Sequence, residues 1–176
     1  MRKITLPLDE ETKKSLHAGD AVLLSGVIYT ARDAAHKKMH ELIKEGKPLP
    51  FEIRDAAIYY VGPTPARPGQ VIGSAGPTTS GRMDPYVPEL AELGLAATIG
   101  KGRRNQKAKE AMLKHHMIYF VAGGGAGALL SHSIVKREPV AFEELLAEAV
   151  MRLRVKDFPC FVGFDTEGND IYDCHE

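Results

Sequence analysis

The densest group of residues that could do chemistry is GSAGPTTSGRMD, residues 73–84. It packs three glycines, a proline, four hydroxyl residues and one arginine into a stretch that follows an apolar run. Backbone N–H groups in such a loop can bind an anion, and the hydroxyls of Thr78 and Thr79 and the guanidinium of Arg82 stand beside them. The glycine spacing approaches that of a phosphate-binding loop, but Arg82 and Met83 replace the lysine and hydroxyl residue that nucleotide binding requires. A glycine- and proline-rich surface turn is the plainer alternative.

A second group, Arg32, Asp33 and His36, comes directly after an apolar run and begins a helical pattern. Spacings of three and four residues place such side chains on neighbouring faces of one helical turn, near the positive end of the helix. Taken alone, Asp33 is equally well explained as an acid at a helix N-terminus, and His36 as a hydrogen-bonded structural histidine.

A third group is Lys101 with Arg103 and Arg104, in the segment IGKGRRNQK. In isolation, a solvated basic loop is the simpler interpretation of this segment. Together, however, the three groups place Arg32, Arg82 and Lys101 after predicted strands, and ligands of α/β folds bind at strand ends. Because the planar arginine fork can hold a carboxylate through two parallel bonds, a small dicarboxylate is the expected ligand.

Hydrophobic periodicity predicts the elements that must position these residues. An apolar, β-branched run over 21–30 predicts a buried strand, and residues 31–46 have the pattern of an amphipathic helix ended by Gly46 and Pro48. Further strands are predicted over 56–61, 70–75, 96–99 and 117–122, and further helices over 88–93 and 105–115.

In the C-terminal third, GGGAGALLSHSI has the form of a strand-to-helix turn, and MRLRVKDFPCFVGFD predicts two β runs joined through Lys156 and Asp157. Residues 143–150 fit a helix or a strand equally well. This alternation, without a repeat or long linker, predicts a mixed α/β fold with a layered sheet core in one domain, residues 1–176.

Composition narrows the possible functions. The 176 residues are 44% hydrophobic, and 23 basic residues balance 23 acidic ones, so the bulk charge gives no reason to expect nucleic acid or an anionic membrane as a partner. No apolar run reaches the length of a membrane span or a secretory signal, so we expect a cytoplasmic protein. Cys160 and Cys174, interpreted as a core thiol and a tail thiol, are too few to hold an iron–sulfur cluster.

Several motifs resemble one enzyme family. GPTTSGRMDPYV resembles the GPTT[AS]GRMD motif of the β region of class I fumarases and L(+)-tartrate dehydratases, and ARDAAHK resembles that family's RDxAH segment. IGKG is similar to its later lysine–glycine element, and VKDFPCFVGFDTEGND resembles its C-terminal VxDFPAF…DxxGND run. The order and spacing also agree, so the resemblance covers most of the chain.

The resemblance implies a mixed-sheet, swivelling β/β/α domain that forms one wall of an active site shared with an α subunit. That subunit would carry a [4Fe–4S] cluster, making the enzyme a hetero-oligomer without activity in this chain alone. Arg32, Arg82 and Lys101 would bind the dicarboxylate and Thr78 would be the catalytic base. Asp33, His36 and Thr79 are the residues that we expect in a supporting role beside them.

The expected activity is that of a fumarate hydratase β subunit, with an L(+)-tartrate dehydratase β subunit as the alternative within the family. Asp33 or His36 could instead accept or relay the proton, because an unperturbed hydroxyl is a poor base. A non-catalytic anion-binding or assembly module is the alternative from another functional class.

Overall fold

The computed structural model describes residues 1–123 and 127–173. The strands are β1 (Arg2–Thr5), β2 (Ala21–Thr30), β3 (Ala57–Tyr59), β4 (Ala97–Gly100), β5 (Ile118–Val121), β6 (Ile134–Ala141) and β7 (Val150–Phe164). The α-helices are α1 (Glu10–Ser15), α2 (Asp33–Lys44), α3 (Val87–Glu92), α4 (Gln106–Lys114) and α5 (Gly127–Ser131). Short 3-10 helices follow the same order: η1 (Ser80–Tyr86), η2 (Glu143–Glu148) and η3 (Ile171–Asp173).

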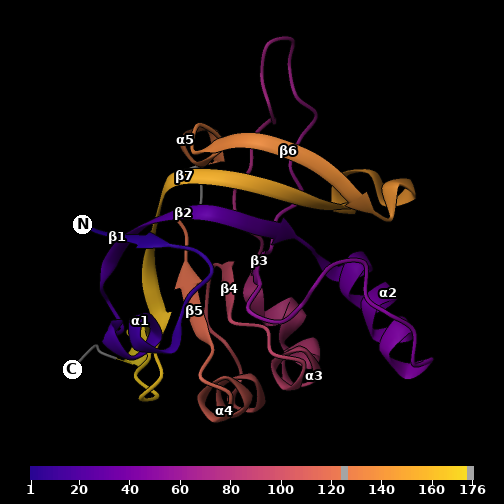
Figure 1. Cartoon of the computed structure of the whole chain (residues 1–176). Helices are drawn as coiled ribbons and strands as arrows, with labels where there is room; N and C mark the ends of the chain where they lie inside the picture. The colour runs from indigo at the N-terminus through magenta and orange to yellow at the C-terminus, as the bar shows by residue number, and fades with distance from the viewer. Residues whose placement is uncertain (124–126, 174–176) are drawn as a thin grey trace.

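The strands form one mixed sheet in the order β1-β2-β3-β4-β5-β7-β6 (Figure 1). Strands β1 to β5 pair in parallel, whereas β7 runs antiparallel to β2, β5 and β6. Because β7 pairs with both β2 and β5, the strands β2, β3, β4, β5 and β7 close into a barrel. The mixed α/β fold predicted from the sequence is therefore confirmed.

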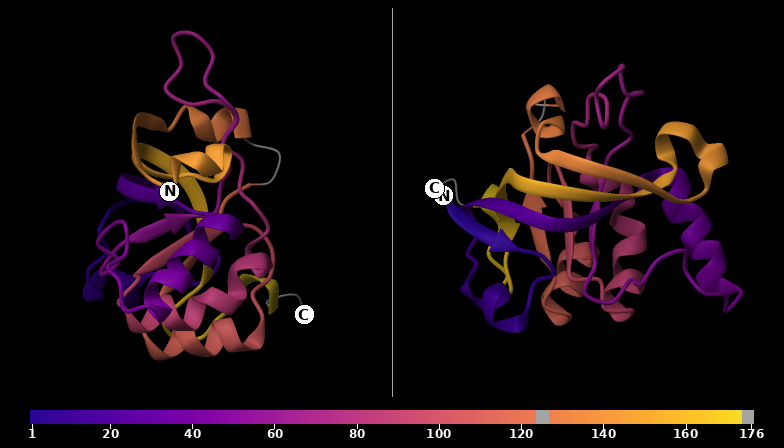
Figure 2. Two further views of the ribbon diagram at one scale, coloured as in Figure 1. Left: turned by 90° about the vertical axis from the view of Figure 1, so that its right-hand side faces the viewer. Right: turned by 45° about the horizontal axis from the view of Figure 1, so that its top comes forward.

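Two apolar cores lie on the two faces of the sheet, as the alternation along β3 shows. Ala57 and Tyr59 belong to the core inside the barrel, with Leu24, Ile99, Phe120 and Leu153 among its other members. Ile58 and the following Tyr60 point the other way, into the core shared with the helices, to which Ala35, Met39, Leu90 and Met112 also belong. Figure 2 shows α2, α3 and α4 on the side of the sheet away from the β6–β7 hairpin.

Most predicted elements are confirmed with small shifts at their ends, including strand β2, helix α2 and the helix α4, whose first turn is capped by Asn105. Two predictions are wrong. Residues 70–75 form no strand, because Ser74 and Ala75 bond to Thr64 and to Gly127 and not to a neighbouring strand ladder. They lie in the long loop between β3 and η1, which rises above β6 in Figure 1.

The C-terminal β runs are also not separate. Strand β7 is continuous over Val150–Phe164, and Asp157, with φ 51°, is accommodated inside it opposite the register shift between Leu24 and Gly26 of β2. Residues 143–150, which the sequence left open, form η2 followed by the start of β7. The glycine turn at 124–126 and Cys174 lie outside the described residues. No helix in the described part of the chain is long and apolar enough to cross a membrane.

Candidate active site

Parallel pairing brings the predicted site residues to one edge of the sheet. Arg32 lies two residues beyond the end of β2, and Lys101 follows β4 directly. The strand between them, β3, is continued by Tyr60, whose N–H donates to the carbonyl of Ile99 in β4 at 2.9 Å. Since neighbouring parallel strands end on the same side, the two cations stand at the same edge.

The loop that carries Thr78 and Thr79 docks between these strand ends. The Thr78 N–H donates to the Tyr60 carbonyl at 2.7 Å, and the Lys101 N–H donates to the Thr78 carbonyl at 3.3 Å. The Ser80 N–H then donates to the Lys101 carbonyl at 2.8 Å, and Thr79 forms a parallel bridge with Lys101. These bonds place Thr78 beside Lys101; the Thr78 side chain is half-buried and that of Thr79 is exposed.

Asp33 lies between the two arginines. Arg82 Nε donates a hydrogen bond to Oδ1 of the Asp33 carboxylate at 3.1 Å, and Arg82 Nη2 lies 2.8 Å from Oδ2 in an ion pair. Arg32 Nη2 lies 3.8 Å from the same Oδ2. Arg32 also packs on Gly62, where a Cβ would come within 2.7 Å of its Nη1. The Arg82 side chain is 52% exposed and that of Arg32 25% exposed, so solvent reaches both side chains in part, although Arg32 Nε itself is buried.

An acidic side chain that the sequence analysis did not identify, Glu148, contacts the N-terminus of α2. Glu148 of η2 accepts a hydrogen bond from the Ala34 N–H at 3.1 Å, where a negative charge is favourable for the helix. Lys38 of α2 pairs with Glu144 of the same short helix at 3.0 Å. Residues 143–150 gave no clear periodicity, so nothing in the sequence placed Glu148 next to Arg32 and Asp33.

His36 is buried directly beneath this cluster. Its Nδ1 lies 2.8 Å from the Arg32 carbonyl, which can only accept, so Nδ1 carries the proton. Nε2 is buried without a hydrogen-bond partner among the described residues, and the ring packs against Tyr60 and Tyr86. Burial lowers the pKa of His36 to about 4, with a contribution from the Arg104 charge, so the ring is neutral at pH 7.

Arg104 corrects the interpretation of the basic segment as a solvated loop. Its side chain is 1% exposed, and its Nε donates to Asp84 Oδ1 at 2.6 Å. The guanidinium also contacts the Tyr60 hydroxyl and Thr98, and lies between the rings of Tyr60 and Tyr119. Asp84 accepts in addition from the Asn105 N–H at 2.8 Å. Asp84 belongs to the segment GSAGPTTSGRMD that the sequence singled out, but residue spacing gave no sign that Arg104 is its partner.

The described residues do not supply the donors of a metal centre. They contain no group of three or more His, Cys, Asp or Glu side chains that could hold a metal ion. Cys160 is buried in the barrel core, and burial raises the pKa of its thiol, which disfavours the thiolate that metal binding needs. The side chains of the described residues therefore do not fit an iron–sulfur cluster.

Comparison with known proteins gives one consistent result. A family model described as Fumarase C-terminus matches residues 1–175. Fumarate hydratase 2 of Leishmania major is 41% identical over 156 residues, which are 88% of this chain and 28% of that protein. The anaerobic class I fumarate hydratase of Escherichia coli K12 is 44% identical over 151 residues, 85% of this chain and again 28% of that enzyme.

A relative of similar size also matches. The protein provisionally named L(+)-tartrate dehydratase subunit beta in Methanocaldococcus jannaschii is 38% identical over 172 residues, which cover 94% of this chain and 88% of that protein. The chain thus spans little more than a quarter of these two fumarate hydratases, but nearly the whole of this relative.

Proposed function

The chain belongs to the fumarase C-terminal family, and on this premise we propose that it is the β subunit of a two-subunit hydro-lyase that interconverts fumarate and malate. One observation carries the proposal: three separate chain segments place Arg32, Arg82 and Lys101 at one sheet edge, around the docked Thr78 loop. A surface that served assembly alone would not need three cations beside a backbone-anchored hydroxyl.

The cations match the charge that the reaction develops. Removing water from malate requires loss of a proton from the carbon beside a carboxylate, so negative charge builds on that carboxylate in the transition state. Fixed cations aimed at this position stabilise the transition state without reorganising. In our proposal Arg32, Arg82 and Lys101 hold the dicarboxylate, and the contact from Asp33 keeps the fork of Arg82 oriented.

Thr78 is the proposed base. Its alternatives are less suited: the carboxylate of Asp33 is already engaged by Arg82, and His36 is buried among aromatic rings with a pKa of about 4. A threonine hydroxyl needs activation to accept a proton, and nearby positive charge favours its ionised form. In our proposal Lys101, whose backbone N–H bonds to the Thr78 carbonyl, supplies that charge.

The [4Fe–4S] cluster that the family resemblance implies belongs, in this proposal, to an α subunit. The described side chains of this chain do not fit the cluster. The fumarate hydratases that match are also far longer than the chain. The M. jannaschii relative, matched over nearly its whole length, is named as a subunit, which supports a separate partner.

The same relative supports L(+)-tartrate dehydratase as the second candidate activity. Tartrate differs from malate by one hydroxyl, so the two substrates would share the same carboxylate-binding cations. A non-catalytic anion-binding module is the remaining class, and it predicts ligand binding without turnover.

The decisive experiment is anaerobic co-expression with candidate α subunits, followed by hydration of fumarate and dehydration of malate and of tartrate. Thr78→Ala should lower kcat by about two to four orders of magnitude with little change in KM, because the cations remain. Thr79→Ala is the matched control, since it deletes an exposed hydroxyl one residue away and should keep near-full turnover.

Each result separates the alternatives. Turnover of tartrate but not of fumarate or malate would select the second candidate, and dicarboxylate binding without turnover in every complex would select the binding module. Near-full turnover in Thr78→Ala, together with loss in Asp33→Asn or His36→Gln, would move the base to the start of α2.

A further inference from the structure

The peptide that follows Lys101 is held on two opposite sides. Its carbonyl, that of Lys101, accepts from the Ser80 N–H at 2.8 Å, and its N–H, that of Gly102, donates to the hydroxyl of Tyr172 at 3.0 Å. Gly102 has a left-handed φ of 85°, a conformation that side chains disfavour. The Gly102 carbonyl in turn accepts from the Tyr119 hydroxyl at 2.7 Å. The backbone that aims the Lys101 side chain is therefore fixed by contacts from distant segments.

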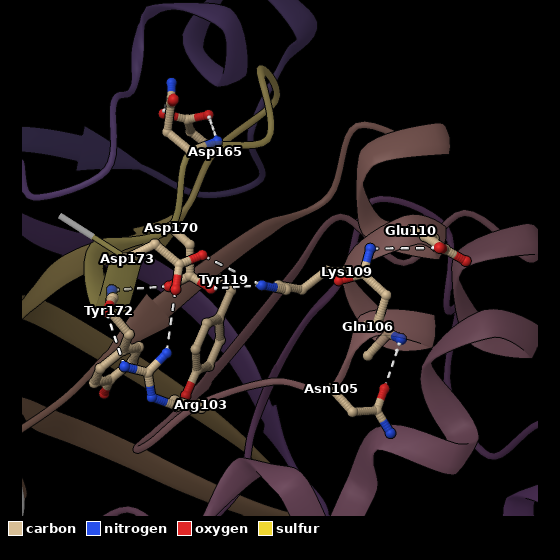
Figure 3. Close-up of polar contacts among 12 residues, drawn as sticks. Arg103, Asn105, Gln106, Lys109, Glu110, Tyr119, Asp165, Asp170, Tyr172 and Asp173 are labelled. Carbon is tan, nitrogen blue, oxygen red and sulfur yellow. Dashed lines mark hydrogen bonds and ion pairs between the residues drawn. The ribbon is translucent and has the colours of Figure 1, made fainter.

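Tyr172 comes from the C-terminal turn, some 70 residues away, and is itself held in place. Its N–H donates to Asp170 Oδ1 at 2.9 Å, and its carbonyl accepts from Arg103 Nη2 at 2.9 Å. Arg103 also lies over the Tyr172 ring and pairs with Asp173 at 3.2 Å. Figure 3 shows Arg103, Tyr172 and Asp173 converging on one another.

Helix α4 anchors this turn from the other side. Lys109 reaches Asp170 at 3.2 Å and Asp173 at 3.5 Å, as Figure 3 also shows. The turn begins at Asp165, a fully buried carboxylate that accepts from the backbone N–H groups of Ala18, Glu167 and Asn169. The segment after β7 is thus held in place by several contacts, and it positions the Tyr172 hydroxyl against the Gly102 N–H.

From these contacts we propose that Tyr172 is a positioning residue for Lys101, and that the C-terminal turn is part of the substrate-binding apparatus. The proposal rests on the proposed function, in which Lys101 binds a carboxylate of the substrate. Without the Tyr172 hydroxyl, the Gly102 N–H loses its acceptor, so one of the bonds that fix the backbone next to Lys101 is lost and the direction of the lysine side chain is less well defined.

The test uses Tyr172→Phe in the complex reconstituted with the α subunit. The KM for the dicarboxylate should rise about tenfold with kcat nearly unchanged, the loss expected of one unmade hydrogen bond at a partly buried N–H. Tyr29→Phe is the matched control, because the Tyr29 ring stacks on Phe51 and its loss of a hydroxyl should leave KM unchanged.

A double-mutant cycle distinguishes positioning from general structural damage. If Tyr172 acts through Lys101, Tyr172→Phe should have almost no further effect on KM in a Lys101→Ala background. Additive losses would overturn the proposal. In the isolated chain, amide hydrogen exchange at Gly102 should accelerate in Tyr172→Phe but not in Tyr29→Phe, and unchanged exchange would also overturn it.

Failures of the two proposals can be told apart. Unchanged KM in Lys101→Ala would remove the binding role of Lys101 and the positioning role of Tyr172 with it, while turnover by the complex would still support the hydro-lyase. A raised KM in Lys101→Ala beside an unchanged Tyr172→Phe enzyme would overturn positioning alone. Should Tyr172→Phe fail to fold, Arg103→Met releases the same turn by removing the contacts of the guanidinium with Tyr172 and Asp173, and should also raise KM.

Discussion

Two arginine–aspartate pairs lie close together in this molecule and differ in how deeply they are buried. The motif GRMD contributes one residue to each: Arg82 pairs with Asp33, and Asp84 pairs with Arg104. The contact distances are similar, 2.8 and 2.6 Å, but the side chains of the first pair are 52% and 36% exposed and those of the second 1% and 3%. The pairing itself therefore does not distinguish Arg82, the predicted binding residue, from Arg104, whereas the burial of the two pairs does.

The difference in burial changes what each pair contributes. An exposed ion pair is screened by water and stabilises a fold by about 0–1 kcal/mol, which leaves its arginine available to a ligand. A buried pair has given up its hydration, so removing one partner leaves an unpaired charge and costs about 3–5 kcal/mol. Asp84 and Arg104 thus hold the Thr78 loop, Tyr60 and α4 together, beneath the exposed cations.

The largest effect is expected from Asp84→Ala. It should lower the free energy of unfolding by about 3–5 kcal/mol, because Arg104 would keep its charge in a buried site without its carboxylate. Asp33→Ala, the equivalent change in the exposed pair, should lower it by less than about 1 kcal/mol. Chemical denaturation of the two variants measures the contrast directly, and equal losses would show that burial is not what distinguishes the pairs.

His36, which lies between the two pairs, should give the molecule a pH-dependent stability. Its pKa is near 6.5 in the unfolded chain and about 4 in the folded protein, so between these values the unfolded chain binds the extra proton. The contribution of His36 to the free energy of unfolding is fully present above pH 6.5. As the pH falls to 4, the free energy of unfolding decreases by roughly 3 kcal/mol.

Denaturation curves recorded from pH 7 to pH 4 for the wild type and for His36→Gln measure this effect. The wild type should lose more stability than the variant over that range, because glutamine does not titrate. Parallel curves would mean that His36 takes up its proton in the folded protein as readily as in the unfolded chain.

The smallest expected effect concerns Arg82→Lys, which keeps the charge but removes the fork. In the reconstituted enzyme the KM for the dicarboxylate should rise about ten- to a hundredfold, while the free energy of unfolding stays within about 1 kcal/mol of the wild type. Arg104→Lys provides the opposite pattern, a large loss of stability from the buried network. An unchanged KM in Arg82→Lys would show that Arg82 is a structural turn residue. The exposed pair would then have no role in binding that sets it apart from the buried pair.

Much of the fold follows from local pattern alone. The apolar, β-branched run of β2 and the amphipathic pattern of α2 are determined within a few residues, so the sequence predicted both elements with close to their observed ends. The 70–75 segment failed because Ile72 and Ala75 are buried for a different reason, packing of a long loop against the barrel. Local hydrophobicity reports burial, but it does not report whether a neighbouring strand is there to pair.

The sequence by itself determined which residue types could bind a dicarboxylate, because charge, hydroxyl groups and glycine spacing are properties of the chain. Only the tertiary structure decided that Arg104 is buried and Arg82 exposed, that Glu148 meets the start of α2, and that Tyr172 holds the peptide after Lys101. These contacts join segments 20 to more than 110 residues apart. Their energies depend on burial and hydrogen-bond geometry, which arise only when the parallel strands bring their ends to the same edge.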